Sequence, residues 1–186
     1  MKIKSIASIC KNNKTIMLYE GESCQWIGNG AAWYPLYNLP TLSEEHIFTM
    51  FDIPDEKKEK YLFQHFDSMP EFCLNDACDN EVQLERADML ICKDGSTYEP
   101  LITENGIIFI NERYLAPFAD CVDGIDLYER KTPSGQQYIA VKEGFLLLGI
   151  VLIVDLITEE FIDEISAILK YSEIIMNRRE SQEVER

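Results

Sequence analysis

Two histidines are the chain's first candidates for acid–base chemistry. His46 falls in the first turn of a predicted helix, and His65 falls in a predicted strand. Histidine is the commonest general base, but neither residue adjoins a serine or cysteine with a nucleophile signature. The acid pairs Glu44-Glu45 and Glu159-Glu160 are explained by the favourable dipole at a helix start. The sequence therefore indicates no catalytic residue, and a small hydrolytic enzyme around His65 is the least supported class of function.

Metal and cofactor motifs are not recognisable either. Asp120, Asp123 and Asp126 flank Gly124, but the spacing of a calcium-binding EF-hand loop is missing. The glycines of 28–30 join two predicted strands, whereas a phosphate-binding loop leads from a strand into a helix. We expect no cofactor and no metal.

The cysteines show no zinc-site spacing and no export signal accompanies them, so we expect reduced thiols. Two of them, Cys10 and Cys92, occupy positions of an apolar pattern and are predicted to be small core residues. The six are Cys10, Cys24, Cys73, Cys78, Cys92 and Cys121.

Two groups of side chains are candidates for binding. The first is a basic cluster around one predicted helix: Lys2, Lys4, Lys11 and Lys14. It is either a phosphate-contacting helix on an otherwise repelling body or a solvated helix face. The second is an aromatic group: Trp26, Trp33, Tyr34 and Tyr37. It is either an interaction surface for bases or a peptide, or a packed sheet face.

The elements that must position these residues follow from apolar periodicity and turn signals. Helices are predicted over 3–12, from Ser43 to before Pro54, from Asn111 to about Cys121, and from Thr158 onward. For the second helix, Thr41 with Glu44 fits a capping box, and Ser43 is the competing cap. Strands are predicted over 15–20, 61–66, 89–93, 97–102, 106–110, 125–130, 137–142 and up to Val154.

The first hairpin has the most specific prediction. Asn29-Gly30 is a strong signal for a type I′ turn, which needs positive φ at both central residues. With these two at the turn, Trp26 faces Trp33 as a cross-strand aromatic pair. Asp94-Gly95 predicts a second such turn.

An internal repeat is suggested by two stretches with the order strand, hairpin, strand, acidic helix start. The first contains 18–20, 25–27 and 40–45, and the second contains 127–129, 137–139 and 156–160. A third stretch, 89–121, shares the order with weaker matches. A duplication would give repeated β-β-β-α units, each helix packed on its own sheet.

Size and charge limit the classes of function. The chain has 186 residues, 46% of them hydrophobic, and a net charge of −16. Such a charge favours solubility and disfavours adhesion to nucleic acid or anionic membrane over most of the surface. The longest apolar run, 145–154, is too short for a membrane helix and predicts a buried strand. We expect a cytoplasmic α+β protein with antiparallel sheets and about four helices.

Several motifs carry a resemblance to a known family. They are 25–30 (Gln-Trp-Ile-Gly-Asn-Gly), 34–37, 39–40, 114–117 and 134–136. The chain resembles a family of short acidic proteins found in gut Firmicutes, in phage-like or conjugative-element contexts. That family has no established activity, so the resemblance implies none. At the level of architecture, repeated strand-and-helix units under an acidic net charge are similar to sliding DNA clamps, although the helices starting at Ser43 and Thr158 are acidic.

The sequence favours a non-enzymatic interaction or accessory protein, with a role in mobile-element DNA metabolism as one setting. Its partner is expected to be a protein or a second copy, bound through a sheet edge or the aromatic group. The alternative is a clamp-like DNA-binding oligomer that uses the four N-terminal lysines. We expect one globular unit over 1–176, its halves (1–66 and 88–176) joined by an acidic loop over 67–87, and a frayed tail over 177–186.

Overall fold

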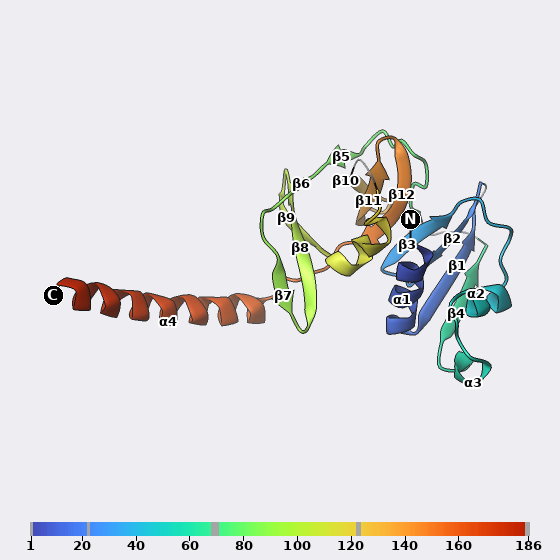
Figure 1. The fold of residues 1–186 in the computed structure, drawn as a ribbon. Helices are drawn as coiled ribbons and strands as arrows, with labels where there is room; N and C mark the ends of the chain where they lie inside the picture. The colour runs from blue at the N-terminus through green and yellow to red at the C-terminus, as the bar shows by residue number, and fades with distance from the viewer. Residues whose placement is uncertain (1, 22, 68–70, 122–123, 185–186) are drawn as a thin grey trace. The chain divides into compact units, whose positions relative to one another are not determined.

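The computed structural model describes the backbone of residues 2–21, 23–67, 71–121 and 124–184, and the side chains of the last helix as far as Ile175. The fold is mixed α+β, as the sequence predicted (Figure 1). The chain divides into two compact units, Met1–Val154 and Asp155–Arg186. The division falls after the last strand, so both halves of the expected globular unit and the acidic loop between them begin within the first unit. The helix of the second unit, α4 (Glu159–Val184), includes most of the segment expected to be frayed.

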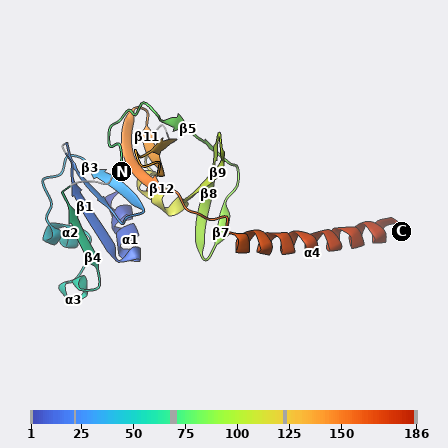
Figure 2. The ribbon, with the colours of Figure 1, turned by 180° about the vertical axis from the view of Figure 1, so that it is seen from behind.

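An eight-stranded sheet organises the first unit (Figures 1 and 2). All pairs of neighbours in it are antiparallel except β1 and β4, which are parallel. Across the sheet the strands are β4 (Leu62–Phe66), β1 (Thr15–Glu20), β2 (Gln25–Gly28), β3 (Ala32–Leu36), β12 (Leu146–Leu152), β11 (Gln137–Glu143), β10 (Asp126–Lys131) and β5 (Val82–Gln83).

A smaller sheet follows in the same unit. Its central strand β8 (Ser96–Thr103) pairs with β6 (Glu85–Arg86), β7 (Ile91–Lys93) and β9 (Gly106–Asn111). The turn between β7 and β8 has positive φ at both Asp94 and Gly95, which is the conformation predicted for it. Asn111 caps the 3₁₀ helix η1 (Glu112–Phe118), since its Oδ1 accepts a hydrogen bond from the backbone of Arg113 at 3.2 Å.

Most helices of the first unit contribute buried side chains to the core on one face of the large sheet. The helix α1 (Ile3–Asn13), close to the predicted range 3–12, buries Ile6, Ala7, Ile9 and Cys10. The helix α2 (Glu44–Met50) begins after Ser43, which is therefore its cap in preference to Thr41. A short helix, α3 (Asp55–Lys58), precedes β4 and buries no residue.

The first hairpin forms, but its register differs from the prediction. Trp26 pairs with Pro35, and Trp33 pairs with Gly28. The turn is shifted because the Asn29 side chain caps it: its Oδ1 accepts hydrogen bonds from the backbone of residues 31 and 32 at 3.1 and 3.0 Å. Asn29 itself keeps a negative φ. The two indoles still lie on one face, where they join the same core cluster.

The suspected repeat has a partial counterpart in the topology. The strands β1, β2 and β3 form one meander and β10, β11 and β12 form another, and the two meet edge to edge at β3 and β12. Their pairings differ, however, because Leu18 pairs with Ile27 whereas Leu127 pairs with Val141, two residues beyond the matching Ile139. A duplication therefore stays a prediction.

The large sheet is covered on both faces by different means. One face packs on α1, α2 and η1, through residues such as Ile6, Ile47 and Phe118. The other face carries the second core cluster, with Trp26 and Trp33 among its members. The cover on that side includes Phe72 and Leu74 of the acidic segment after β4, and the described residues of that segment form no helix. Holding a segment without regular structure against a sheet needs specific polar contacts, because its backbone groups have no ladder to join.

Candidate functional site

The four N-terminal lysines do not form a free basic surface. Lys2 Nζ pairs with the Asp120 carboxylate at 2.8 Å, and Lys11 Nζ donates to the Phe51 backbone oxygen at 2.8 Å. The two other lysines of the cluster are exposed: Lys4 and Lys14. A phosphate-contacting role for all four would require two of them to leave these partners, and the DNA-binding alternative stays a prediction.

The predicted aromatic interaction surface is corrected by the structure. Trp26 and Trp33 are 3% exposed and Tyr34 is 0% exposed, so these rings are part of the core. They are buried because both faces of the sheet are covered. Tyr37 is more exposed, and its hydroxyl donates to the backbone oxygen of Leu147 at 3.1 Å.

The two histidines have different surroundings. His46 completes the cap of α2: its Nδ1 lies 3.2 Å from the backbone nitrogen of Ser43, whose Oγ in turn accepts from the backbone of His46. His65 lies on β4, with Nε2 3.6 Å from the Glu20 carboxylate. We therefore assign His46 a structural role, whereas His65 belongs to a surface groove between α2 and β4.

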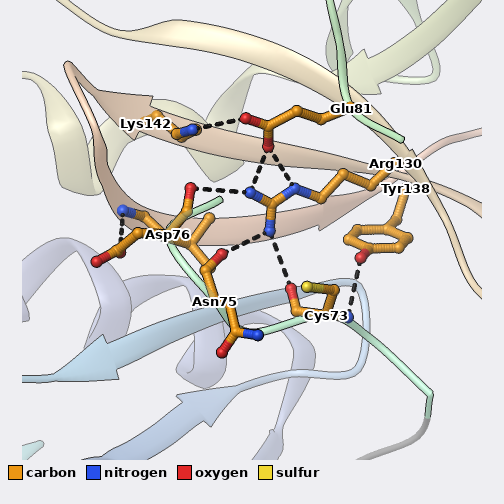
Figure 3. A network of polar contacts seen from close by, with 8 residues as sticks. Cys73, Asn75, Asp76, Glu81, Arg130, Tyr138 and Lys142 are labelled. Carbon is orange, nitrogen blue, oxygen red and sulfur yellow. Dashed lines mark hydrogen bonds and ion pairs between the residues drawn. The ribbon is translucent and has the colours of Figure 1, made fainter. Parts of the chain in front are cut away.

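The buried cation Arg130 of β10 makes most of the polar contacts that hold the segment 71–81 against the sheet (Figure 3). The Arg130 side chain is fully buried and all five of its N–H donors have acceptors. Nε and Nη2 donate to Glu81 Oε2, the former at 2.9 Å. The remaining donors bond to the backbone oxygens of Cys73, Asn75 and Asp76 at 2.9 to 3.1 Å.

A second cation shares the same carboxylate. Lys142 Nζ donates to Glu81 Oε1 at 2.8 Å and lies 4.7 Å from the centre of the Tyr128 ring. Burial raises the pKa of Glu81, but the hydrogen bonds from Lys142 and Arg130 outweigh that effect, so the pKa lies below its ordinary value. The Glu81 carboxylate is therefore ionised at neutral pH and balances one of the two buried positive charges.

Further contacts hold the same segment at other points. The backbone nitrogen of Cys73 donates to the Tyr138 hydroxyl at 3.0 Å, and Asp76 Oδ1 accepts from the backbone of Leu147 at 2.9 Å. Phe72 packs edge to face on Tyr138 with ring centres 4.9 Å apart. Because every Arg130 donor already has an acceptor within the chain, we interpret this network as a structural anchor rather than a ligand site.

The cysteines differ in burial. Cys10 is fully buried, and burial raises the pKa of its thiol to about 12, which agrees with a core residue. Cys92 is exposed, which corrects the prediction that it belongs to the core. Burial also raises the pKa of Cys73, so this thiol is protonated at neutral pH and a poor nucleophile.

An open groove runs between α2 and β4 in the first unit. It consists of two adjoining pockets of about 570 and 490 Å³, which share Glu44 and Phe63. The first pocket is lined by Glu44, Glu45, Phe48, Lys58, Glu59, Tyr61, Leu62 and Phe63. The second is lined by Leu18, Glu20, Thr41, Leu42, Ser43, Glu44, Phe63 and His65. The floor is aromatic, with the Phe48 and Phe63 rings 5.8 Å apart, and the rim is acidic.

The strand along this groove has an unpaired edge. β4 pairs with β1 on one side, and within the described residues no strand pairs with its other side. The backbone nitrogen of Leu62 donates to the Lys14 oxygen at 2.9 Å, and the register is parallel. Alternation along a parallel strand then turns the N–H and C=O groups of Phe63 and His65 away from β1. Among the described residues, these four backbone groups have no hydrogen-bond partner.

Sequence reasoning missed this groove. The pattern over 61–66 predicts a strand and Ser43 predicts a helix start, but nothing local indicates that β4 returns to lie beside β1. In the sequence alone, the helix dipole is a sufficient explanation for Glu44 and Glu45 at the start of α2. In the structure these two residues also line the groove beside β4, where they contribute negative charge.

A third pocket, of about 770 Å³, lies near η1 and the smaller sheet. Its buried carboxyl is Glu99, whose pKa is raised by burial and lowered in part by Arg86. Arg86 Nε pairs with that carboxylate at 3.1 Å, and the neighbouring Asn111 side chain caps η1. Glu99, Arg86 and Asn111 of this pocket thus already have partners within the chain.

Neither a metal-ligand cluster nor a membrane-spanning helix is found in the described part of the chain. Among those residues, no three His, Cys, Asp or Glu side chains are grouped closely enough to hold a metal ion. None of the described helices has the length and apolar character needed to cross a membrane. Comparison of the chain with protein-family models, curated proteins and solved structures gives no match.

Proposed function

We propose that this chain is a non-enzymatic interaction protein that binds an extended segment of a partner protein along β4. The observation that carries the proposal is the unpaired edge of β4 beside the groove. Two N–H donors and two C=O acceptors point outward there, spaced as the edge of a sheet presents them to another strand. Strand addition is a common mode of peptide recognition, in which backbone hydrogen bonds give affinity and adjacent pockets give specificity.

The composition of β4 supports the same conclusion. Sheet edges are usually protected by proline, by lysine, by a bulge or by very short length. β4 has five residues, Leu-Phe-Gln-His-Phe, with no proline or lysine among them. Its first residue, Leu62, is 52% exposed. The opposite end of the sheet is β5, which is only two residues long and lies next to the anchored acidic segment.

The test uses a library of random peptides selected on the purified chain. Binding of the selected peptides is then compared between two variants, His65→Pro and His65→Ala. Proline removes the outward N–H at this position but no hydrogen bond to β1, since the backbone N–H of His65 points away from that strand. Alanine removes the same imidazole and keeps the N–H, so it is the matched control.

We expect the peptides to bind His65→Ala nearly as well as the wild type and His65→Pro at least about tenfold more weakly, the equivalent of about 1.4 kcal/mol. Both variants should keep the native tryptophan emission. Equal binding to both variants, or a library that yields no binder, would contradict the proposal.

A further inference from the structure

The rim of the groove has a strong bias toward negative charge. Four glutamates line its two pockets: Glu20, Glu44, Glu45 and Glu59. The described cationic side chains that line it are Lys58 and, when protonated, His65. Glu20 already contacts His65 and Gln25, but the other three glutamates make no ion pair among the described residues. The groove therefore presents more carboxylates than cations beside the unpaired strand edge.

Lys58 shows how this groove accommodates a cation. Its Nζ pairs with Asp55 at 2.7 Å and lies 5.4 Å from the centre of the Phe48 ring. The hydrogen bond to Asp55 is the main reason that the pKa of Lys58 is raised, and the charges of Glu44 and Glu45 raise it further. Cation, aromatic ring and carboxylates are thus combined at one end of the groove by the chain's own residues.

The geometry of strand addition determines which side chains of a partner reach the carboxylates. Tyr61, Phe63 and His65 alternate along β4 and contribute to the groove, so the same face of an added strand lies over α2. Every second side chain of the partner points toward that face, about 6.6 Å from the next. Tyr61 lines one pocket and His65 the other, so successive positions of this kind lie beside different pockets. Long aliphatic stems at these positions would lie over Phe63 and Phe48.

From these observations we propose that the groove takes an extended, basic peptide segment, with Lys or Arg at alternate positions, as an added strand on β4. This inference rests on the proposed function and specifies the chemistry of the partner. An acidic peptide or a nucleic acid backbone would be repelled by the same glutamates. The alternative occupant of the β4 edge is a segment of a second copy of this chain, and the sedimentation experiment below distinguishes it from a basic peptide.

The experiment measures the affinity of three blocked hexapeptides for the full chain by fluorescence anisotropy. All three alternate Val with a second residue, which is Lys in the first, Glu in the second and Thr in the third. We expect the Lys peptide to bind at least about tenfold more tightly than the Glu peptide, and to lose most of that advantage between 50 and 500 mM salt, because the Debye length falls to a few ångströms.

A matched pair of variants assigns the preference to the groove. Glu44→Gln with Glu59→Gln removes two carboxylates from the rim, and Asp163→Asn with Glu164→Gln removes two exposed ones from α4. We expect the first pair to weaken the Lys peptide by about fivefold, in keeping with two partly exposed ion pairs. The second pair should change its affinity by less than about twofold, since long-range charge is screened.

The outcomes separate the two proposals. Equal binding of all three peptides that is lost with His65→Pro would overturn the basic preference and leave strand addition standing. Binding of the Lys peptide that is insensitive to His65→Pro would overturn both. Sedimentation of the chain alone gives the last check: a dimer that dissociates with His65→Pro would show that a second copy occupies the edge, and would overturn the basic peptide as its occupant.

Discussion

Replacing the buried Arg130 should destabilise the first unit far more than replacing the exposed Arg113. Arg130→Met keeps an unbranched apolar stem and removes all five N–H donors. The backbone oxygens of Cys73, Asn75 and Asp76 then lose the donors they bond to in the native state. The segment 71–81 would have to expose these groups to water or leave them unpaired.

The size of the loss follows from these contacts. Each backbone oxygen left dry and unpaired costs about 1–3 kcal/mol. Glu81 keeps its contact with Lys142 at 2.8 Å, so its charge is not left without a partner. Entry of water limits the total, because the Glu81 side chain is 16% exposed. We expect a net loss of about 3–5 kcal/mol, the range measured for breaking a buried ion pair and a large part of the stability of a typical domain.

Urea unfolding followed by tryptophan emission measures this loss, since both indoles lie in the core of the first unit. Arg113→Met is the matched control: this exposed arginine also donates to two side chains, at 3.0 and 2.8 Å, and its loss should cost less than about 1 kcal/mol. Arg130→Lys keeps the charge without the planar fork and should recover less than half of the loss. Equal destabilisation by Arg130→Met and Arg113→Met would refute the anchoring role.

Three further predictions concern two carboxyl groups and a pair of glycines. The pKa of Glu81 is lowered in the folded chain. The ionised carboxylate therefore stabilises the fold above pH 4.5, the ordinary pKa, and this stabilisation is lost as the pH falls through the folded pKa. Glu81→Gln should make stability less dependent on pH in the acid range. The pKa of Glu99 is raised, chiefly by burial. The protonated carboxyl is therefore fully favourable to folding below pH 4.5, the ordinary pKa, and that stability is lost as the pH rises through the folded pKa. Glu99→Gln should stabilise the fold more at pH 7 than at pH 4. Gly28→Ala should cost about 3 kcal/mol or more, because the new Cβ would lie 2.1 Å from a backbone oxygen, whereas Gly95→Ala meets no atom within 4 Å and should cost only the about 1–2 kcal/mol of its positive φ.

Urea titrations across pH 3 to 8 check the first two of these predictions, and titrations at pH 7 check the third. A Glu81→Gln protein whose acid-side profile matches the wild type would contradict the assigned ion pairs. For the glycines, a Gly28→Ala cost no greater than that of Gly95→Ala would show that the hairpin relaxes around the added methyl group.

The sequence predicts well the elements whose signals are local. The strand Thr15–Glu20 has the predicted bounds, and the Asp94-Gly95 turn has the predicted backbone conformation. The predicted register of the first hairpin is wrong by two residues, although both hairpins carry a turn signal of the same kind. The difference is the Asn29 side chain, which bonds to two backbone groups and moves the turn one position along the chain.

Features that depend on distant contacts could not be predicted. The parallel pairing of β4 with β1 joins residues 47 positions apart, since Thr15 pairs with Leu62, and it alone makes β4 an edge. Arg130 has the same limitation, because its partners lie about 50 positions earlier in the chain. The candidate site thus came from tertiary structure, and only its strand and helix came from sequence.

Amide hydrogen exchange tests the central claim most directly, because it observes the backbone N–H groups that define the edge. Leu62 and Gln64 donate toward β1 and should be protected in the free chain, whereas Phe63 and His65 should exchange rapidly. On saturation with the alternating Val-Lys peptide, we predict at least about tenfold slower exchange at Phe63 and His65, with little change at Leu62 and Gln64. Unchanged exchange at Phe63 and His65 in the saturated complex would contradict binding by strand addition to β4.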